Sequence, residues 1–222
     1  IEPSSLDENI LWVGTDDGNV QVTKDGGKNW QNVVSNIQGL PSNTWTYHIE
    51  ASVHGKGIAY AVFDGHNSGD MKPYVYKTSD FGTTWTNIIT DNIIGTSRNI
   101  QEDYENENLL FLGTEFGLYI TADGGKNWEK FTKNVPPVAV HFIDLQKQTN
   151  DLVLGTHGRG ILIIDDISPL REINAEVLKS KLHFFSSKPM KLSDESGFAG
   201  SFGAETQFVG ENANRSPQIK YL

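Results

Sequence analysis

One short glycine-rich segment combines a titratable ring with a fixed cation. It reads Thr156-His157-Gly158-Arg159-Gly160. The two glycines give a turn backbone freedom, and the imidazole and guanidinium are groups that bind a carboxylate or sugar hydroxyls. The segment is therefore a candidate binding turn, with His157 and Arg159 as its binding residues. The alternative is that Arg159 forms an ion pair with an acid such as Glu115 and only ties neighbouring turns together.

Acidic residues follow two other Gly-Thr pairs in the chain. Asp16 and Asp17 come directly after Gly14-Thr15, and Glu115 comes directly after Gly113-Thr114. Glycoside hydrolysis uses a pair of carboxyl groups about 5 to 10 Å apart. Asp16, Asp17 and Glu115 are therefore candidate catalytic acids. Their separation is not set by the sequence, because they belong to different segments.

A longer loop, Asp64-Gly-His66-Asn-Ser-Gly-Asp70, carries further polar side chains. Asp64 and His66 are candidate binding residues. Because oxygen ligands alternate along the loop, Asp64 and Asp70 could also wrap a calcium ion, although the loop lacks the terminal bidentate glutamate of an EF-hand. The alternative is a plain exposed loop. No other cofactor or metal is predicted.

The elements that position these residues are marked by a repeated pattern, Thr-x-Asp-x-Gly-x-x-Trp. Its three copies place the aspartate, glycine and tryptophan at Asp25, Gly27 and Trp30, at Asp80, Gly82 and Trp85, and at Asp123, Gly125 and Trp128. The aspartate can accept hydrogen bonds from the amides just beyond it, the glycine can take positive φ, and the tryptophan can begin the outgoing strand. The pattern predicts a hairpin turn in a repeated sheet unit, with the aspartates as turn braces and not as catalytic groups.

The pattern resembles the Asp-box, or BNR repeat, of β-propeller proteins. The resemblance implies four-stranded blades with the box between the third and fourth strands, on the rim away from the ligand-binding face. The turns between second and third strands then share the opposite rim. This geometry gathers the candidate residues on one face: Asp16, Asp17, Asp64, His66, Glu115, His157 and Arg159.

The predicted fold is an all-β partial propeller of about four four-stranded blades. The blades are expected at residues 1–38, 43–92, 95–134 and 138–168. The first is expected to have its inner strand before Ile1, and the last is incomplete because no fourth box follows Asp165. Open sheet edges are normally removed by closing the ring. The remaining blades are therefore expected from the same polypeptide, of which this chain would be a fragment, or from another subunit.

The C-terminal residues are predicted to leave the propeller. Ser168 and Pro169 indicate a helix entry, with the serine as cap and the proline in the first turn. Residues 169–206 are predicted to form a helix and a linker, and residues 207–222 to begin a further β domain.

Composition excludes several classes of function. The chain has 222 residues with 22 glycines and 10% aromatics, as a globular β protein would. Its net charge of -10 and the lack of a basic stripe argue against a nucleic-acid partner. No apolar run is long enough to span a membrane. The absence of cysteine excludes disulfides and thiol catalysis.

Residues outside these turns are predicted to have mainly structural roles. Trp45 and Tyr47 alternate along a predicted inner strand, where they either approach a central channel to stack on sugars or pack between blades; we favour packing. Of the arginines, only Arg159 is placed on the candidate face. Four histidines without ligand spacing are interpreted as packing or surface residues: His48, His54, His141 and His183.

The segment 155–170, with the later His183-Phe-Phe185, resembles the end of the propeller in large bacterial proteins of the sortilin-like class, commonly labelled glycosyl hydrolases. The resemblance implies a secreted or cell-surface bacterial protein, and we expect a binding or scaffolding module. Two alternatives stay open: a glycoside hydrolase using the acids named above, and sortilin-like peptide or protein binding with Arg159 on a peptide carboxylate. A hydrolase should show two carboxylates at one cleft, at least one with a raised pKa, whereas a binding module should show an aromatic or charged surface.

Overall fold

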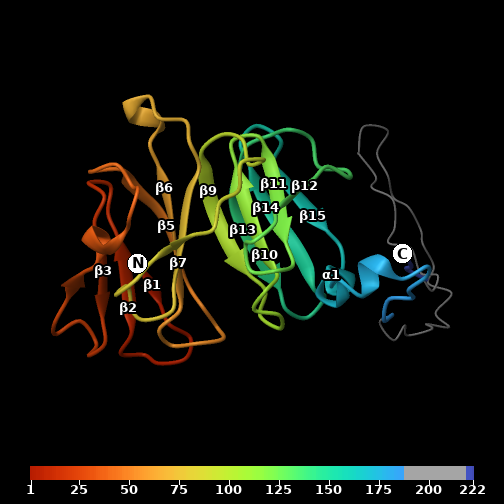
Figure 1. Cartoon of the computed structure of the whole chain (residues 1–222), viewed down its shortest axis with the longest axis horizontal. Helices are drawn as coiled ribbons and strands as arrows, with labels where there is room; N and C mark the ends of the chain where they lie inside the picture. The colour runs from red at the N-terminus through yellow and green to blue at the C-terminus, as the bar shows by residue number, and fades with distance from the viewer. Residues whose placement is uncertain (188–218) are drawn as a thin grey trace, which may run out of the picture. The chain divides into compact units, whose positions relative to one another are not determined.

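The computed structural model describes residues 1–187 and 219–222. The chain divides into two compact units, Ile1–Asn174 and Ala175–Leu222. The first unit contains four antiparallel sheets, each formed by strands that follow one another in the chain (Figure 1).

The strand bounds follow the repeat. The first sheet contains β1 (Glu2–Pro3), β2 (Leu11–Gly14), β3 (Val20–Thr23) and β4 (Gln31–Asn32). The second contains β5 (Trp45–Ala51), β6 (Ala59–Asp64), β7 (Tyr74–Thr78) and β8 (Thr86–Asn87). The third contains β9 (Ser97–Glu102), β10 (Leu110–Thr114), β11 (Gly117–Thr121) and β12 (Glu129–Phe131). The fourth contains β13 (Val140–Gln146), β14 (Asp151–Thr156) and β15 (Ile161–Ile164).

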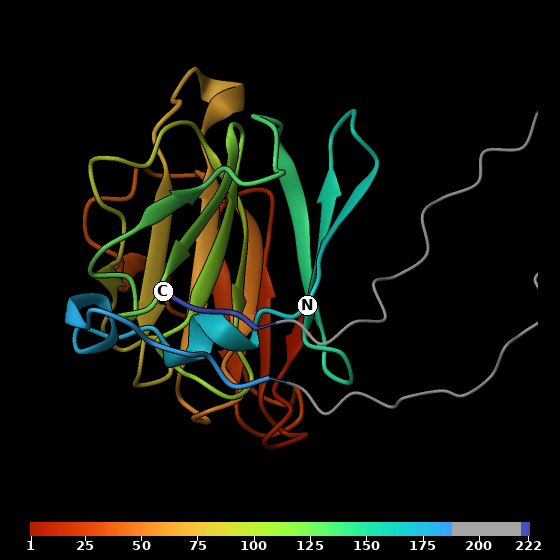
Figure 2. The same cartoon turned by 90° about the vertical axis from the view of Figure 1, so that its right-hand side faces the viewer.

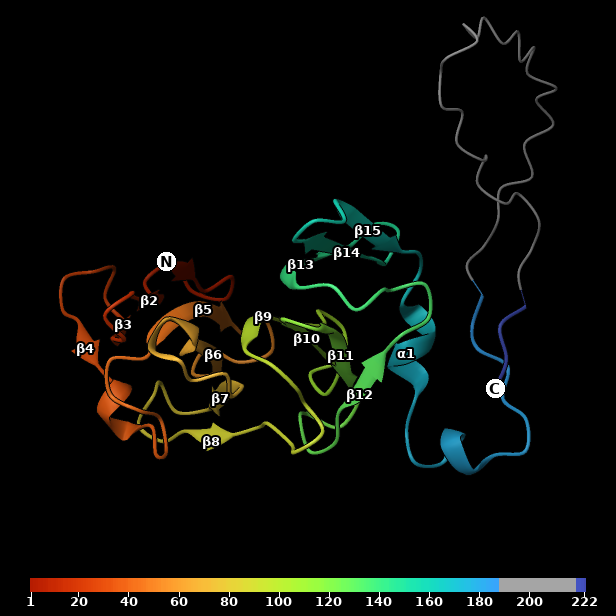
Figure 3. The same cartoon turned by 90° about the horizontal axis from the view of Figure 1, so that it is seen from above.

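The sheets stand side by side like the leaves of a fan (Figure 3). The first strands of neighbouring sheets lie next to one another, as β1 does with β5, β5 with β9, and β9 with β13. The short outer strands β4, β8 and β12 lie on the other side of the fan. This is the arrangement expected of consecutive propeller blades.

Apolar side chains from facing sheets fill the spaces between them. Trp12 from the first sheet packs with Phe63 and Tyr76 from the second, and Trp128 from the third sheet packs with Val62 of the second. A third cluster joins the third and fourth sheets. All six residues of β6 are buried, because the second sheet is covered on both faces.

Two differences from the predicted blades concern their ends. The inner strand of the first blade, predicted before Ile1, is β1, which pairs with β2 through Glu2 and Pro3. That prediction is wrong, because a two-residue strand containing proline shows no alternating pattern. Proline fits there because β1 is an edge strand and does not need every amide.

The helix entry differs in detail from the prediction. Helix α1 covers Ser168–Glu172, so Ser168 is its first residue and Ile167 occupies the cap position without a side-chain cap bond. The Ser168 hydroxyl donates to Asp166 Oδ1 at 2.6 Å. Two short 3-10 turns also occur in the first unit, η1 (Val34–Asn36) and η2 (His66–Ser68), and one in the second, η3 (Val177–Lys179).

Among the described residues of the second unit, an antiparallel bridge joins Phe184 to Tyr221. Most of the predicted linker and of the predicted further β domain lies outside the described residues.

Each repeated aspartate is bonded within its own turn. Asp25 Oδ1 accepts from the Asn29 amide at 2.9 Å, and Asp25 Oδ2 accepts from the Asn29 side chain at 2.7 Å. The Thr23 hydroxyl donates to the same carboxylate and accepts from the Gly27 amide. The bonds from the Asn29 side chain and backbone and from Thr23 lower the pKa of Asp25 to about 2. The other two copies have the same bonds, which hold the third and fourth strands together.

Candidate functional site

A set of polar side chains from three sheets meets at the rim opposite these turns. We call it the rim cluster, and it consists of Tyr47, Asp64, Arg98, Glu115 and His141. Arg98 Nη1 donates to Asp64, and Arg98 Nη2 donates to Glu115 Oε2 at 2.7 Å. The side chain of Asp64 is fully buried and that of Arg98 is 8% exposed, so this charge network joins the second sheet to the third away from bulk water.

Aromatic rings extend the cluster into a row. The centroids of Trp45 and Tyr47 lie 4.9 Å apart, and the Tyr47 hydroxyl lies 3.0 Å from His141 Nδ1 in a hydrogen bond. The ring of His141 is tilted by 30° against that of His157, with centroids 5.6 Å apart. Arg98 stands over the Tyr47 ring at 5.3 Å. We call Trp45, Tyr47, His141 and His157 the ring row.

One repeated backbone feature places three of these residues. The pairing of β5 with β6 shifts register between Thr46 and His48, which leaves Tyr47 as the extra residue of a bulge. The same shift leaves Arg98 as the extra residue of β9, and His141 as that of β13. A β-bulge bends the strand and turns a side chain to a new direction. Three inner strands thus each direct one bulge residue to a common site.

Burial and neighbouring charges shift the pKa values of Tyr47 and His141. Burial raises the pKa of Tyr47. Burial, followed by the positive charge of Arg98 and by His157, lowers the pKa of His141. His66 Nδ1 also contacts Asp64 Oδ2 at 2.6 Å. The charge of Arg98 is already met by two carboxylates, so the cluster offers no free cation to an anionic ligand.

The structure brings together four of the predicted site residues. Asp64, His66 and Glu115 contact or surround Arg98, and His157 contacts His141. The loop after β6, which carries His66, stands at the top in Figure 1 and at the same end in Figure 2.

The other predicted residues of this face lie apart from the rim cluster. Asp16 and Asp17 are exposed on the β2–β3 turn. Asp17 accepts from the Thr15 hydroxyl and from Asn19 Nδ2, and these bonds lower its pKa. Arg159 is exposed on the β14–β15 turn, and within the described ranges it makes no ion pair. Glu115 pairs with Arg98 instead, so the alternative in which Arg159 forms an ion pair with an acid such as Glu115 does not hold for that acid.

Sequence reasoning missed Arg98, Tyr47 and His141 as members of one site. Placing Arg98 off the candidate face was wrong, whereas His141, interpreted as a packing or surface residue, packs against Tyr47 and His157. A β-bulge changes the alternation of apolar and polar residues very little, so the sequence pattern did not indicate the three bulges. A usable signal is a polar or aromatic residue near the start of each inner strand, at matching places in successive repeats.

The predicted calcium loop has other partners for its carboxylates. The Asp64 carboxylate is bonded to Arg98 and His66. Asp70 Oδ2 accepts a hydrogen bond from the Tyr74 hydroxyl at 2.7 Å. Across residues 1–187 and 219–222, no group of three histidine or acidic side chains is placed to hold a metal ion.

The acid with the most raised pKa is further along β5. Burial, then the nearby charges of Glu2 and Glu102, raise the pKa of Glu50 to about 8. Burial lowers the pKa of the adjacent His48 to about 4. Gln101 Nε2 donates to Glu50 Oε1 at 2.6 Å. The sequence did not single out Glu50, because its burial depends on the third sheet.

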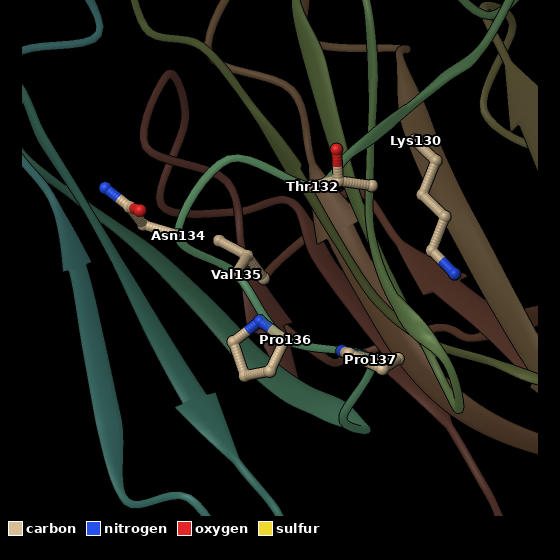
Figure 4. A pocket seen from close by; sticks show the side chains of 6 residues that line it. All are labelled: Lys130, Thr132, Asn134, Val135, Pro136 and Pro137. Carbon is tan, nitrogen blue, oxygen red and sulfur yellow. The ribbon is translucent and has the colours of Figure 1, made fainter.

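Hollows beside the sheets differ in whether they share residues with the rim cluster. A cavity of about 190 Å³ lies beside the bulge in β5 and is lined in part by Thr46, Tyr47 and His48. A larger depression of about 610 Å³ follows the connection from β12 to β13, where Figure 4 shows Val135, Pro136 and Pro137 in sequence. The smaller cavity shares Tyr47 with the rim cluster, and the larger one has none of its residues.

Comparisons with known proteins agree with this architecture. Residues 119–130 match the BNR/Asp-box repeat family model. An oligoxyloglucan reducing end-specific xyloglucanase from Emericella nidulans is 32% identical over 91 residues, which is 38% of this chain and 10% of that protein. The chain therefore spans a small part of this curated relative.

Solved structures show the same fold. The GH74 xyloglucanase from Xanthomonas campestris has a TM-score of 0.61 at 13% identity, covering 83% of this chain and 31% of that one. The structure of YCF48 bound to D1 peptide has a TM-score of 0.55 at 18% identity, covering 75% of this chain and 51% of that one. The prediction of an all-β partial β-propeller with Asp-box hairpins is confirmed. Among the described residues, no helix has the length and apolar character to cross a membrane.

Proposed function

We propose, on the premise that this chain is a run of Asp-box β-propeller blades, that it is a binding module for an uncharged carbohydrate and acts in a secreted or cell-surface protein. The ligand would lie over the ring row at the rim cluster. The observation that carries the proposal is the set of three bulges that turn Tyr47, Arg98 and His141 to one site.

The chemistry of the site favours a sugar. Aromatic rings bind the apolar faces of pyranose rings, and the ring row gives such faces across the second and fourth sheets. The Glu115 side chain is 34% exposed, so its carboxylate can also accept from sugar hydroxyls. Because two carboxylates meet one guanidinium, an acidic sugar or a phosphate would be repelled.

Hydrolysis is a second candidate, favoured by the named relatives, which include a curated xyloglucanase and a GH74 xyloglucanase. Against it, the carboxyl groups of Asp64 and Glu115 are both held by Arg98. Neither acid is arranged to donate a proton to a leaving group. Glu50 is better suited by its raised pKa, but it lies in the interior of β5 and its Oε1 already accepts from Gln101 Nε2.

Peptide binding is supported by one neighbour, because YCF48 was solved with a D1 peptide. That likeness shows the fold alone. The exposed Arg159 is the residue that would hold a peptide carboxylate. A protein-binding role would therefore use the β14–β15 turn more than the ring row.

A glycan screen with matched variants tests the proposal. Neutral and acidic oligosaccharides are presented to the intact chain and to Tyr47→Ala, with Arg159→Ala and Asp16→Asn as controls on the same rim. We expect neutral glycans to bind, Tyr47→Ala to lose that binding while still folded by circular dichroism, and both controls to keep it. Binding lost in Arg159→Ala but kept in Tyr47→Ala would favour the peptide-type site. Release of reducing sugar by the intact chain would favour the hydrolase.

A further inference from the structure

The loop after β6 begins with a buried carboxylate that holds a histidine ring. The side chain of Asp64, the last residue of β6, is fully buried. Its Oδ1 accepts from the His66 backbone amide at 3.0 Å, and its Oδ2 lies 2.6 Å from His66 Nδ1. Because Oδ2 also accepts from Arg98, the hydrogen-bond network assigns the proton of the neutral His66 ring to Nδ1. The other ring nitrogen, Nε2, is then a hydrogen-bond acceptor.

The loop that carries His66 is closed by its own bonds. The Gly65 carbonyl accepts from the amides of Ser68 and Asp70, at 2.9 and 3.1 Å, and from the Ser68 hydroxyl at 2.8 Å. The Tyr74 hydroxyl donates to Asp70 Oδ2 at 2.7 Å, which joins the far end of the loop to β7. The His66 ring is therefore held in place before a ligand arrives, and a group that is already ordered loses less entropy on binding.

His66 and Glu115 lie on either side of one guanidinium. His66 Nδ1 and Arg98 Nη1 bond to the same Asp64 oxygen, so the imidazole and the guanidinium are neighbours. The other terminal nitrogen of the guanidinium, Nη2, donates to Glu115 Oε2 at 2.7 Å. The side chains of His66 and Glu115 are 37% and 34% exposed, whereas those of Asp64 and Arg98 between them are buried. We call His66 and Glu115 the acceptor pair.

Each member of the acceptor pair has an acceptor atom to offer. Across residues 1–187 and 219–222, no donor bonds to His66 Nε2 or to Glu115 Oε1. A carboxylate has no proton to donate, and the neutral imidazole uses its one N–H on Asp64. The acceptor pair therefore needs a ligand that brings donors.

We propose that the acceptor pair sets the specificity of the carbohydrate site, by accepting hydrogen bonds from two free hydroxyl groups of a neutral sugar that stacks on the ring row. This inference rests on the function proposed above and specifies its ligand. A hydroxyl blocked as an ether or ester has no proton to donate, so a blocked sugar would cover both acceptors without satisfying them. The site therefore selects sugars that are unsubstituted at these two positions.

Nitrogen NMR of the histidine side chains tests the first step without any glycan. In the intact chain, at a pH at which the His66 ring is neutral, we expect the proton on Nδ1 and none on Nε2. The variant His66→Phe identifies the His66 signals, because they disappear from its spectrum. A proton on Nε2 would overturn the inference, since the ring would then present a donor to the ligand.

Titration calorimetry with cellotetraose, maltotetraose and mannotetraose tests the second step. We expect His66→Phe to weaken the binding of the preferred sugar about 3- to 10-fold, as the loss of one hydrogen bond would. One singly deoxygenated form of that sugar should show the same loss with the unmodified chain and no further loss with His66→Phe, because the same bond is missing in both. Asn67→Ala, at the next exposed residue of the loop, is the matched control and should leave the affinity unchanged.

Glu115→Gln tests the other member of the acceptor pair in the same way. Its effect should coincide with the removal of a different hydroxyl group, because the two acceptors contact separate positions of the sugar. The same hydroxyl for both variants would overturn the inference that two donors are bound.

The outcomes separate this inference from the proposed function. Equal affinity of the unmodified chain and His66→Phe, with binding still lost in Tyr47→Ala, would overturn the acceptor pair and leave the carbohydrate site in place. Losses from His66→Phe and from deoxygenation that add at every position would also overturn it, since His66 would then contact no hydroxyl. If none of the tetrasaccharides binds the unmodified chain, the proposed function fails and the acceptor pair fails with it.

Discussion

The two rims of this fan are built in opposite ways. At the box rim each aspartate bonds to residues no more than four positions away, and the same bonds recur in three copies. In the rim cluster, Arg98 bonds to Asp64 and Glu115, and Tyr47 bonds to His141, between residues 17 to 94 positions apart. The first rim is a repeated local motif, and the second is assembled once from different blades.

The difference teaches where specificity can arise in a repeated fold. A local brace must be the same in every blade, because each turn has to close in the same way. A bulge constrains the backbone and not the type of side chain, so the bulge residue can differ between blades. It is Tyr47 in β5, Arg98 in β9 and His141 in β13. We expect substitutions at the box rim and in the Arg98 charge network to change stability, and substitutions of the ring row to change binding.

The largest expected effect is at the third box. Trp128→Ala removes a buried ring and its bond to Ile88, and should cost about 3–5 kcal/mol of unfolding free energy. The matched Trp30→Ala should cost less than about 1 kcal/mol in the 222-residue chain, because the Trp30 ring is exposed to solvent. Urea unfolding measures both. Equal losses would contradict the contrast between the two boxes.

Breaking the charge network comes next. Arg98→Met leaves the buried Asp64 without its cation and should cost about 2–4 kcal/mol, less than for a fully buried pair because Glu115 is partly exposed. Adding Asp64→Asn should recover part of that loss. A double variant as unstable as the sum of the two single variants would show that the network is not coupled.

Removing a turn brace should have a smaller cost. Asp123→Ala leaves the amides of Lys126 and Asn127 without their acceptor, and should cost about 1–3 kcal/mol. Asp16→Ala, an exposed acid on the other rim, should stay within about 0.5 kcal/mol. Glycan binding by folded Asp123→Ala should be unchanged; selective loss of binding would place the boxes at the ligand site.

The acids of the boxes and of β5 should respond oppositely to pH. The pKa of Asp25 is about 2, below its value of about 4 in an unfolded chain, so its contribution to stability is present above pH 4 and lost as pH falls towards 2. The pKa of Glu50 is raised to about 8, so its contribution is full below about pH 4 and is lost as pH rises to 8. Denaturation of Glu50→Gln across that range should show a smaller decline than the unmodified chain. An equal loss of stability in the variant and the unmodified chain would mean that groups other than Glu50 cause the decline.

A small effect on stability is expected at the ring row. Tyr47→Phe keeps the ring but removes the bond to His141, at about 0.5–1.5 kcal/mol. Glycan affinity, measured by calorimetry, should fall far less than in Tyr47→Ala, since stacking is retained. A complete loss of binding in Tyr47→Phe would mean that the hydroxyl, and not the ring face, holds the ligand.

The sequence by itself determined the local parts of this protein. Thr23, Asp25, Gly27 and Asn29 close the first box turn within one short segment of the chain, so the pattern could be interpreted without tertiary information. The same holds for the box copies and for the alternating strands between them. The sequence pattern did not predict β1, because its two residues form a strand only by pairing with β2.

Only the tertiary structure decided which side chains meet. Arg98 joins Asp64 and Glu115 because β9 stands beside β5 and its bulge turns the guanidinium to the rim. Glu50 has a raised pKa because neighbouring sheets bury it. Both depend on packing between blades and on register shifts of one residue, and neither is encoded in a short stretch of chain. A repeat pattern therefore fixes the blades, whereas the chemistry between them follows from how they are placed.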